Sequence, residues 1–136
     1  MLDLTPLEKA IKSLSEAIEV AQDKEFFEVL TAKQQRAIKA GVIQNFEFTY
    51  ELSWKFIKRW LEHNLGSVYV DGVSRRELFR IAAEQRLIDD VEQWMFFHRS
   101  RNLTSHTYDE ATAEEVFQSS LGFLVFATAL LSVIGD

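Results

Sequence analysis

One segment of this sequence brings together side chains that could act on a phosphate. It reads Arg101-Asn102-Leu103-Thr104-Ser105-His106-Thr107-Tyr108. The guanidinium of Arg101 is permanently cationic and suits a phosphate, and the imidazole of His106 can move a proton near neutral pH. An imidazole acting on a 2′-hydroxyl or a leaving oxygen, beside a guanidinium that stabilises charge on the phosphate, is the minimum for RNA cleavage without a metal. The segment is therefore a candidate site for that chemistry.

The spacing of this pair restricts how the two side chains can meet. Five residues along an ideal helix separate Arg101 and His106 by about 140°. A single phosphate can contact both only if the helix unwinds near Ser105, or if the site is assembled from two chains. We favour the second arrangement, because another helix of the chain independently indicates a dimer.

The helix that leads into this segment changes character along one face. A spacing of three and four residues places these side chains on one stripe: Val91, Trp94, His98, Arg101, Ser105 and Tyr108. The stripe begins apolar and ends ionisable, and burying its polar end would be costly unless it faces a cleft or an interface. His98 is expected in that polar cleft. The alternative is that the helix simply emerges into solvent after Phe97.

The elements that must position these residues are predicted to be helices. Apolar residues recur at intervals of three and four, and one Pro and five Gly leave little material for turns. Three capping boxes mark helix starts, at Thr5-Pro6-Leu7-Glu8, Ser74-Arg75-Arg76-Glu77 and Thr112-Ala113-Glu114-Glu115. A further helix should begin near Asp89-Asp90. We predict a single all-α domain over residues 1–136, an up-and-down bundle of about five helices.

The central helix is expected from Val42 to Asn64, with Gly66 as a left-handed stop. A weaker amphipathic stretch from Glu25 to Lys39 precedes it, and Gly41 could separate the two. Its main apolar stripe comprises Ile43, Phe46, Tyr50, Trp54, Ile57 and Leu61. A second apolar line lies on the opposite side and comprises Phe48, Leu52, Phe56 and Trp60. A helix that is apolar on two sides is buried on two sides, which in so small a protein indicates a homodimer.

Composition excludes several classes of function. The 136 residues contain no Cys, which removes disulfides, zinc ribbons, iron–sulfur clusters and thiol nucleophiles. Lys and Arg number 15 against 21 Asp and Glu, and this net charge of −6 argues against a non-specific DNA coat. The three histidines, His63, His98 and His106, lack metal-ligand spacing, so no metal is expected, nor any cofactor.

The location of the protein is predicted from two negative observations. The first 24 residues alternate charged and apolar side chains, so no signal peptide is expected. The apolar run Leu121–Ile134 is shorter than the roughly 20 residues of a membrane span. We expect a soluble, cytoplasmic protein.

Two blocks of the sequence resemble a known family. They are Gln44-Asn45-Phe46-Glu47-Phe48-Thr49-Tyr50-Glu51-Leu52-Ser53-Trp54-Lys55 and the Arg101–Tyr108 segment continued by Asp109-Glu110. Together they resemble the nucleotidyltransferase substrate-binding protein family, a branch of the HEPN superfamily. The resemblance in helix order and motif spacing covers essentially the whole chain.

The resemblance implies a dimeric all-α HEPN bundle that acts beside a separately encoded minimal nucleotidyltransferase. In one role the chain binds nucleotide or RNA for that partner. In another it is the ribonuclease toxin of a toxin–antitoxin pair, silenced when the partner transfers AMP to a tyrosine. Residue by residue, Arg101 and His106 would be catalytic, Asn102 would support them, and Tyr108 would be modified. Ser105, from the polar end of the stripe, is a further candidate for binding. A third reading is a helical adaptor without catalytic activity.

One further hypothesis comes from the helical wheel alone. Glu47 lies within about 40° of the direction of Ile43, on the inward stripe of the central helix. A carboxylate in that position needs a partner, and Arg101 is the cation on an inward stripe elsewhere. We therefore expect Glu47 to pair with Arg101 and orient it, unless Glu47 lies at the margin and reaches solvent. Glu51 and Lys55 are expected to form an i,i+4 surface pair.

Overall fold

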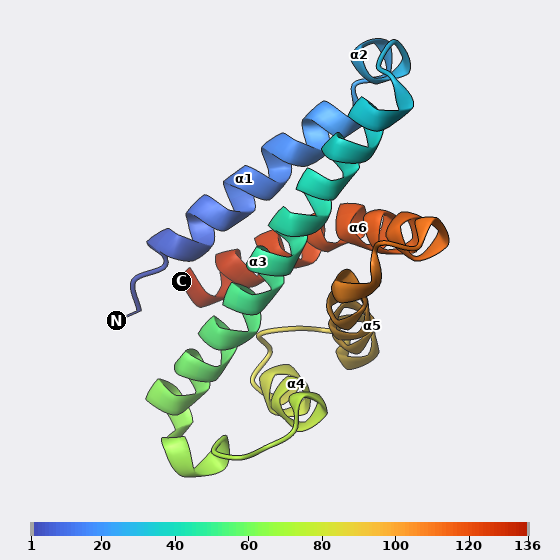
Figure 1. Ribbon diagram of the computed structural model, residues 1–136. Helices are drawn as coiled ribbons and strands as arrows, with labels where there is room; N and C mark the ends of the chain where they lie inside the picture. Colours follow the sequence, from blue (N-terminus) through green and yellow to red (C-terminus); the bar gives the residue numbers. More distant parts are fainter. Residues whose placement is uncertain (1, 136) are drawn as a thin grey trace.

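The computed structural model describes residues 2–135, and the fold is an all-α bundle (Figure 1). The helices are α1 (Thr5–Gln22), α2 (Lys24–Glu28), α3 (Ala32–Leu65), α4 (Arg75–Glu84), α5 (Val91–Asn102) and α6 (Glu110–Gly135). Two short 3₁₀ turns, η1 (Ser67–Tyr69) and η2 (Leu103–His106), join α3 to α4 and α5 to α6. The predicted fold class is confirmed.

The long helix α3 organises the bundle. It lies antiparallel to α1, with α2 at the tip of this hairpin, and α6 crosses both helices (Figure 1). The short helices α4 and α5 cover the second half of α3. Helices α1, α4, α5 and α6 all pack against α3, so α3 is the element against which the end of α5 is positioned.

Gly41 does not divide the central helix, which corrects the sequence prediction. α3 runs unbroken for 34 residues from a capping box in which Thr31 and Gln34 bond reciprocally to each other's backbone N–H. A glycine in a helix interior costs about 1 kcal/mol relative to alanine. The neighbouring Val42 is fully buried and Ile43 nearly so, and the burial of these apolar side chains offsets that cost.

Helix ends were predicted with mixed success. Gly66 ends α3 as expected, although its φ of 110° and ψ of 145° lie outside the left-handed helical region. Ser74 caps α4 by accepting from the Glu77 N–H at 3.1 Å, and Asp90 caps α5 by accepting from the Gln93 N–H at 3.1 Å.

Two predicted capping boxes are wrong. Thr5 is the first helical residue rather than the cap, and its N–H bonds the carboxylate of Asp3 at 3.1 Å. α6 begins two residues before Thr112, because Asp109 accepts both the N–H and the hydroxyl of Thr112. In both places a nearby aspartate satisfies the first turn, and a carboxylate is also favoured there by the helix dipole.

The core is built around one aromatic ring of α6. The ring of Phe123 lies 5.0 to 5.9 Å, between centroids, from four other aromatic rings. These belong to Phe46, Tyr50, Trp94 and Phe97, and all five side chains are at most 2% exposed. This cluster ties α6 to α3 and α5.

The second apolar line of α3 does not require a partner chain throughout. Phe56 is only 1% exposed within the single chain, and Leu52 and Trp60 are half-buried. Phe48 alone remains largely in solvent, at 59% exposure. The chain's own residues cover most of this line, so it supports a dimer only at Phe48.

The helix α6 also meets the length and hydropathy criteria for a membrane span. An 18-residue stretch of α6 is apolar enough to cross a membrane, and it is longer than residues 121–134. The prediction that the apolar run is too short is therefore wrong by length and composition. A core helix of a bundle passes the same test, and one side of α6 is buried against α1, α3 and α5. Val125 and Val133 lie on its exposed side.

Candidate functional site

The end of α5 is where the candidate site forms. α5 stops at Asn102, and the chain continues as the 3₁₀ turn η2 through His106. Arg101 is thus in the last helical turn, whereas His106 follows in a differently wound segment. Of the two arrangements that the spacing allows, the unwound helix is present in the chain. The two-chain arrangement that we favoured stays a prediction.

Arg101 is held by two carboxylates of α3. Its Nη1 lies 3.3 Å from Oε2 of Glu47, and its Nε lies 3.0 Å from Oε1 of Glu51. Nη1 also donates to the hydroxyl of Thr104 at 3.2 Å, and that hydroxyl contacts Oε2 of Glu47. The expected pair between Glu47 and Arg101 is confirmed, and Thr104, which the sequence did not single out, joins it.

The contact with Glu51 differs from that with Glu47. Arg101 Nε is buried and has no aligned hydrogen bond, although the Glu51 oxygen is within ion-pair distance. The attraction at this edge is therefore electrostatic rather than a well-directed hydrogen bond. The side chain of Arg101 is 29% exposed. Part of the side chain can therefore be reached from solvent.

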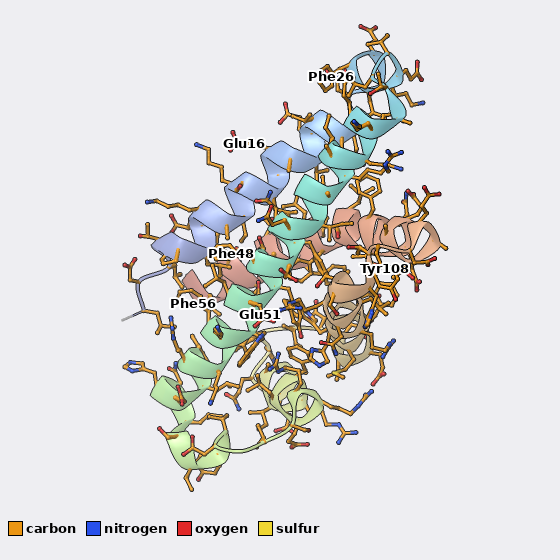
Figure 2. The ribbon with its side chains drawn as sticks, in the orientation of Figure 1. Glu16, Phe26, Phe48, Glu51, Phe56 and Tyr108 are labelled. Atoms are coloured by element: carbon orange, nitrogen blue, oxygen red, sulfur yellow. The ribbon has the colours of Figure 1, made fainter. Side chains whose placement is uncertain are left out.

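Glu51 does not form the surface pair that was expected with Lys55. Its Oε1 contacts Arg101, and its Oε2 accepts a hydrogen bond from Trp54 Nε1 at 3.1 Å. Lys55 instead lies over the Trp54 ring, with Nζ 5.8 Å from the centroid. Figure 2 shows Glu51 on the side of α3 that faces α5. The i,i+4 spacing predicted Lys55 as the ion-pair partner of Glu51, but that partner is Arg101 of α5.

His98 lies one turn before Arg101 and is half-buried against α3. Its Nδ1 is 2.9 Å from the hydroxyl of Tyr50. Burial lowers the pKa of His98 below its ordinary value of 6.5, and the positive charge of Arg75 lowers it further. Burial also raises the pKa of Tyr50 well above its ordinary 10, against the charge of Arg75. Tyr50 therefore keeps its proton, and its hydroxyl and the imidazole of His98 share one hydrogen bond across the α3–α5 interface.

The remaining residues of the segment face solvent. Asn102, Ser105, His106 and Tyr108 are all exposed, and Tyr108 reaches 86%. The rings of His106 and Tyr108 are 6.3 Å apart between centroids. No hydrogen bond or ion pair joins this exposed group to the Arg101 side chain within residues 2–135. The structure thus separates an anchored arginine from an accessible histidine and tyrosine on the adjoining turn.

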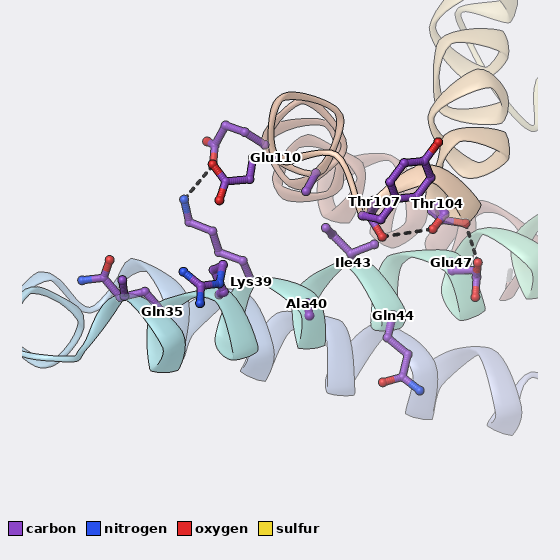
Figure 3. Close-up of a pocket in the computed structure, with 14 residues that line it drawn as sticks. Gln35, Lys39, Ala40, Ile43, Gln44, Glu47, Thr104, Thr107 and Glu110 are labelled. Carbon is purple, nitrogen blue, oxygen red and sulfur yellow. Dashed lines mark hydrogen bonds and ion pairs between the residues drawn. The ribbon is translucent and has the colours of Figure 1, made fainter.

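A groove of about 790 Å³ adjoins the site (Figure 3). It lies between the first half of α3 and the start of α6, and Glu47, Thr104 and Tyr108 are among the residues that line it. Lys39 and Glu114 form an ion pair across it at 2.6 Å, drawn as a dashed line in Figure 3. The carboxylate that holds Arg101 therefore also faces an open groove.

Comparison with known proteins places the chain in a family. A family model described as "nucleotidyltransferase substrate binding protein like" matches residues 2–134. The chain belongs to that family. A curated relative from Haemophilus influenzae, named "Probable ribonuclease HepT", is 34% identical over 131 residues, which is 96% of this chain and 90% of the relative.

Two solved structures are similar to this member of the nucleotidyltransferase substrate-binding family. One, from Haemophilus influenzae, is described as revealing the fold of a substrate-binding domain of a nucleotidyltransferase. It is 32% identical, with a TM-score of 0.94, and the match covers 98% of this chain and 100% of that one. The other, from Thermus thermophilus, is 26% identical with a TM-score of 0.72, covering 93% and 99%.

In this member of the nucleotidyltransferase substrate-binding family, the two sequence blocks that carried the resemblance meet in space. Glu47 and Glu51 come from the first block and hold Arg101 of the second. Tyr50 of the first block binds His98, one turn before the second. The first block therefore supplies the surface against which the second is fixed.

Proposed function

We propose that this chain binds a nucleotide or RNA at the end of α5 and works in the cytoplasm with a separately encoded minimal nucleotidyltransferase. The observation that carries the proposal is the anchoring of Arg101. Glu47 and Glu51 hold its Nη1 and Nε while the side chain stays 29% exposed, and the adjoining segment carries the exposed His106 and Tyr108. A pre-oriented guanidinium loses less entropy when it binds a phosphate than a free one does. The family's description, and that of the similar Haemophilus structure, support a nucleotidyltransferase partner.

The charge of the anchored group limits this proposal to a ligand that brings further contacts. One guanidinium beside two carboxylates has a formal charge of −1, so its long-range field does not attract a phosphate. Binding must then depend on short-range hydrogen bonds from the exposed part of the guanidinium and on the neighbouring exposed side chains. The exposed candidates to supply these contacts are Asn102, at the end of α5, and Ser105 and His106 on the adjoining turn.

A second candidate function is cleavage of RNA as the toxin of a toxin–antitoxin pair. The exposed imidazole of His106 favours it, as does the name of the relative at 34% identity. His106 would take the proton of a 2′-hydroxyl, whose oxygen attacks the adjacent phosphorus and expels the 5′-oxygen, while Arg101 stabilises the charge that develops on the phosphate. The hydroxyl of Tyr108 would accept AMP from the partner, with loss of pyrophosphate from ATP.

We also propose that the functional unit is a homodimer. Arg101 is turned toward α3 and His106 toward solvent, so a second copy could bring the His106 of one chain to the Arg101 of the other. The exposed apolar side chain of Phe48, at 59% on the second apolar line of α3, supports an interface between copies. Sedimentation equilibrium of the purified protein tests this proposal, and a monomer at micromolar concentration would contradict it.

The test of function is a cleavage and binding assay with three variants. The protein, checked by intact mass to carry no added AMP, is incubated with total RNA in EDTA and titrated with labelled RNA. The variants are His106→Ala, Arg101→Lys, and His63→Ala as a matched control, because His63 is exposed at the far end of α3. Cleavage by the parent and by His63→Ala, but not by His106→Ala, supports the ribonuclease.

The remaining outcomes separate binding from an adaptor role. RNA or nucleotide binding without cleavage, weakened in Arg101→Lys but not in His63→Ala, supports the binding subunit. Neither binding nor cleavage by the parent contradicts both proposals and leaves the helical adaptor.

A further inference from the structure

A chain of contacts connects α4 to Arg101 through α3. The guanidinium carbon of Arg75 lies 3.5 Å from the centroid of the Trp54 ring. Trp54 Nε1 donates to one oxygen of Glu51 at 3.1 Å, and the other oxygen of Glu51 lies 3.0 Å from Arg101 Nε. The four residues come from three helices. Trp54 contacts Arg75 through its ring face and Glu51 through its N–H, and Glu51 uses one oxygen for Trp54 and the other for Arg101.

Glu51 has two cations within reach on this surface. Lys55 is one turn further along α3, the usual position for a helical ion pair, and Arg101 is across the interface on α5. One oxygen of Glu51 faces Arg101, and the other can bond to a second donor. The N–H of Trp54 occupies that second oxygen, and Lys55 is left over the ring of Trp54 instead.

The indole can make this selection because its own orientation is restricted. An indole N–H is a donor only, and a guanidinium stacked on the ring favours one position of the ring plane. Arg75 supplies that stacking from the first residue of α4, directly after the Ser74 cap. The docking of α4 on α3 is thereby coupled to the position of a carboxylate one helical turn away.

We propose that Trp54 and Arg75 are positioning residues for Arg101. By holding Glu51 away from Lys55, they keep a carboxylate on Arg101 Nε and so set which edge of the guanidinium faces outward. The consequence for ligand binding rests on the proposed function, in which Arg101 contacts a phosphate. The orientation of Arg101 itself does not depend on that function.

The variant that isolates the indole donor is Trp54→Phe. It keeps an aromatic ring beneath Arg75 and Lys55 and removes the N–H that binds Glu51, together with part of the ring. Trp60→Phe is the matched control, because Trp60 is another half-buried tryptophan of α3 and has no hydrogen bond to Glu51. Arg75→Lys is a second variant, which keeps the charge but loses planar stacking.

The first readout is the Nε–Hε signal of Arg101 in the NMR spectrum of ¹⁵N-labelled protein, assigned by its absence in Arg101→Lys. We expect Trp54→Phe to shift this signal and to speed its exchange with water, and Arg75→Lys to act in the same direction. Trp60→Phe should leave it unchanged. An unshifted, equally protected signal in Trp54→Phe would overturn the proposal.

The second readout is rescue, which general loss of packing would not produce. If Lys55 competes for Glu51, then removing its charge in Trp54→Phe/Lys55→Met should return the Arg101 signal toward that of the parent. Failure of the double variant to recover the signal contradicts the role assigned to Lys55 and with it the selection by Trp54.

The third readout is affinity for the RNA used above. Trp54→Phe should weaken binding about fivefold, in the range expected for a partly exposed ion pair, with Trp60→Phe unchanged. A shifted Arg101 signal with unchanged affinity would support the positioning role and contradict the proposed contact between Arg101 and phosphate. The two proposals therefore fail separately.

Discussion

Glu47 of α3 and Arg101 of α5 face each other with Oε2 and Nη1 3.3 Å apart, and Thr104 bonds to both. The two residues belong to helices that are distant in sequence, so their ion pair fixes the end of α5 on α3. The side chains are 40% and 29% exposed, respectively. Solvent therefore screens the attraction, which limits what the pair contributes to the free energy of unfolding.

Glu47→Gln is expected to destabilise the fold only slightly and to reduce function more. The free energy of unfolding should fall by about 0.5 to 1 kcal/mol, the range for exposed ion pairs, measured by urea denaturation. RNA binding or cleavage should decrease, because Nη1 of Arg101 loses its charged partner. Glu16→Gln is the control, an exposed glutamate of α1 that forms no ion pair among residues 2–135 (Figure 2). Unchanged stability and function in Glu47→Gln would show that Glu47 does not orient Arg101.

The sequence predicted this pair but not the whole cluster, for a physical reason. The 3.6-residue period indicated which side of each helix faces inward, and Glu47 and Arg101 were both on such a side. Glu51 was assigned to Lys55 because only local partners can be counted from one sequence. Glu51 instead contacts Trp54 and Arg101. The contact with Arg101 depends on how α3 packs against α5, and the spacing of residues within one helix does not predict that packing.

Two predicted helix starts were wrong for a related reason. The apolar periodicity predicted the helical segments, but residues one or two positions away competed for the role of cap. Asp109 took it from Thr112, and Asp3 satisfied the N–H of Thr5. The unwinding of α5 into η2, which gives the candidate site its shape, was one of two arrangements that the spacing allowed.

The stability of the fold should depend on pH through His98. Its pKa in the folded protein is lower than the ordinary 6.5, so between the two values the unfolded chain binds the proton and the folded chain does not. The free energy of unfolding should therefore fall as pH decreases below 6.5, until the folded pKa is passed. The ring signals of His98 in an NMR titration should have a midpoint below 6.5, and His98→Gln should flatten the pH dependence. A midpoint at or above 6.5 would contradict the burial of this ring.

Replacing Gly41 should stabilise α3. A Cβ built at Gly41 meets no atom within 4 Å, and the residue lies in the interior of a continuous helix. Gly41→Ala should therefore raise the free energy of unfolding by about 0.5 to 1 kcal/mol. Gly66→Ala is the contrasting change, because its φ of 110° is strained for any residue with a Cβ, and it should destabilise. Loss of stability in Gly41→Ala would indicate that the helix is interrupted there.

Two phenylalanines should lose very different amounts of stability when they are truncated. Phe123 is fully buried among four aromatic rings, and Phe123→Ala should cost about 3 to 5 kcal/mol through lost burial and a residual cavity. Phe48 is 59% exposed on the outer side of α3, and Phe48→Ala should change the unfolding of the monomer by less than about 0.5 kcal/mol. If copies of the chain associate through this side, Phe48→Ala should instead raise the dimer dissociation constant in sedimentation experiments. A large loss of stability in Phe48→Ala that does not depend on protein concentration would mean that Phe48 belongs to the core of the single chain.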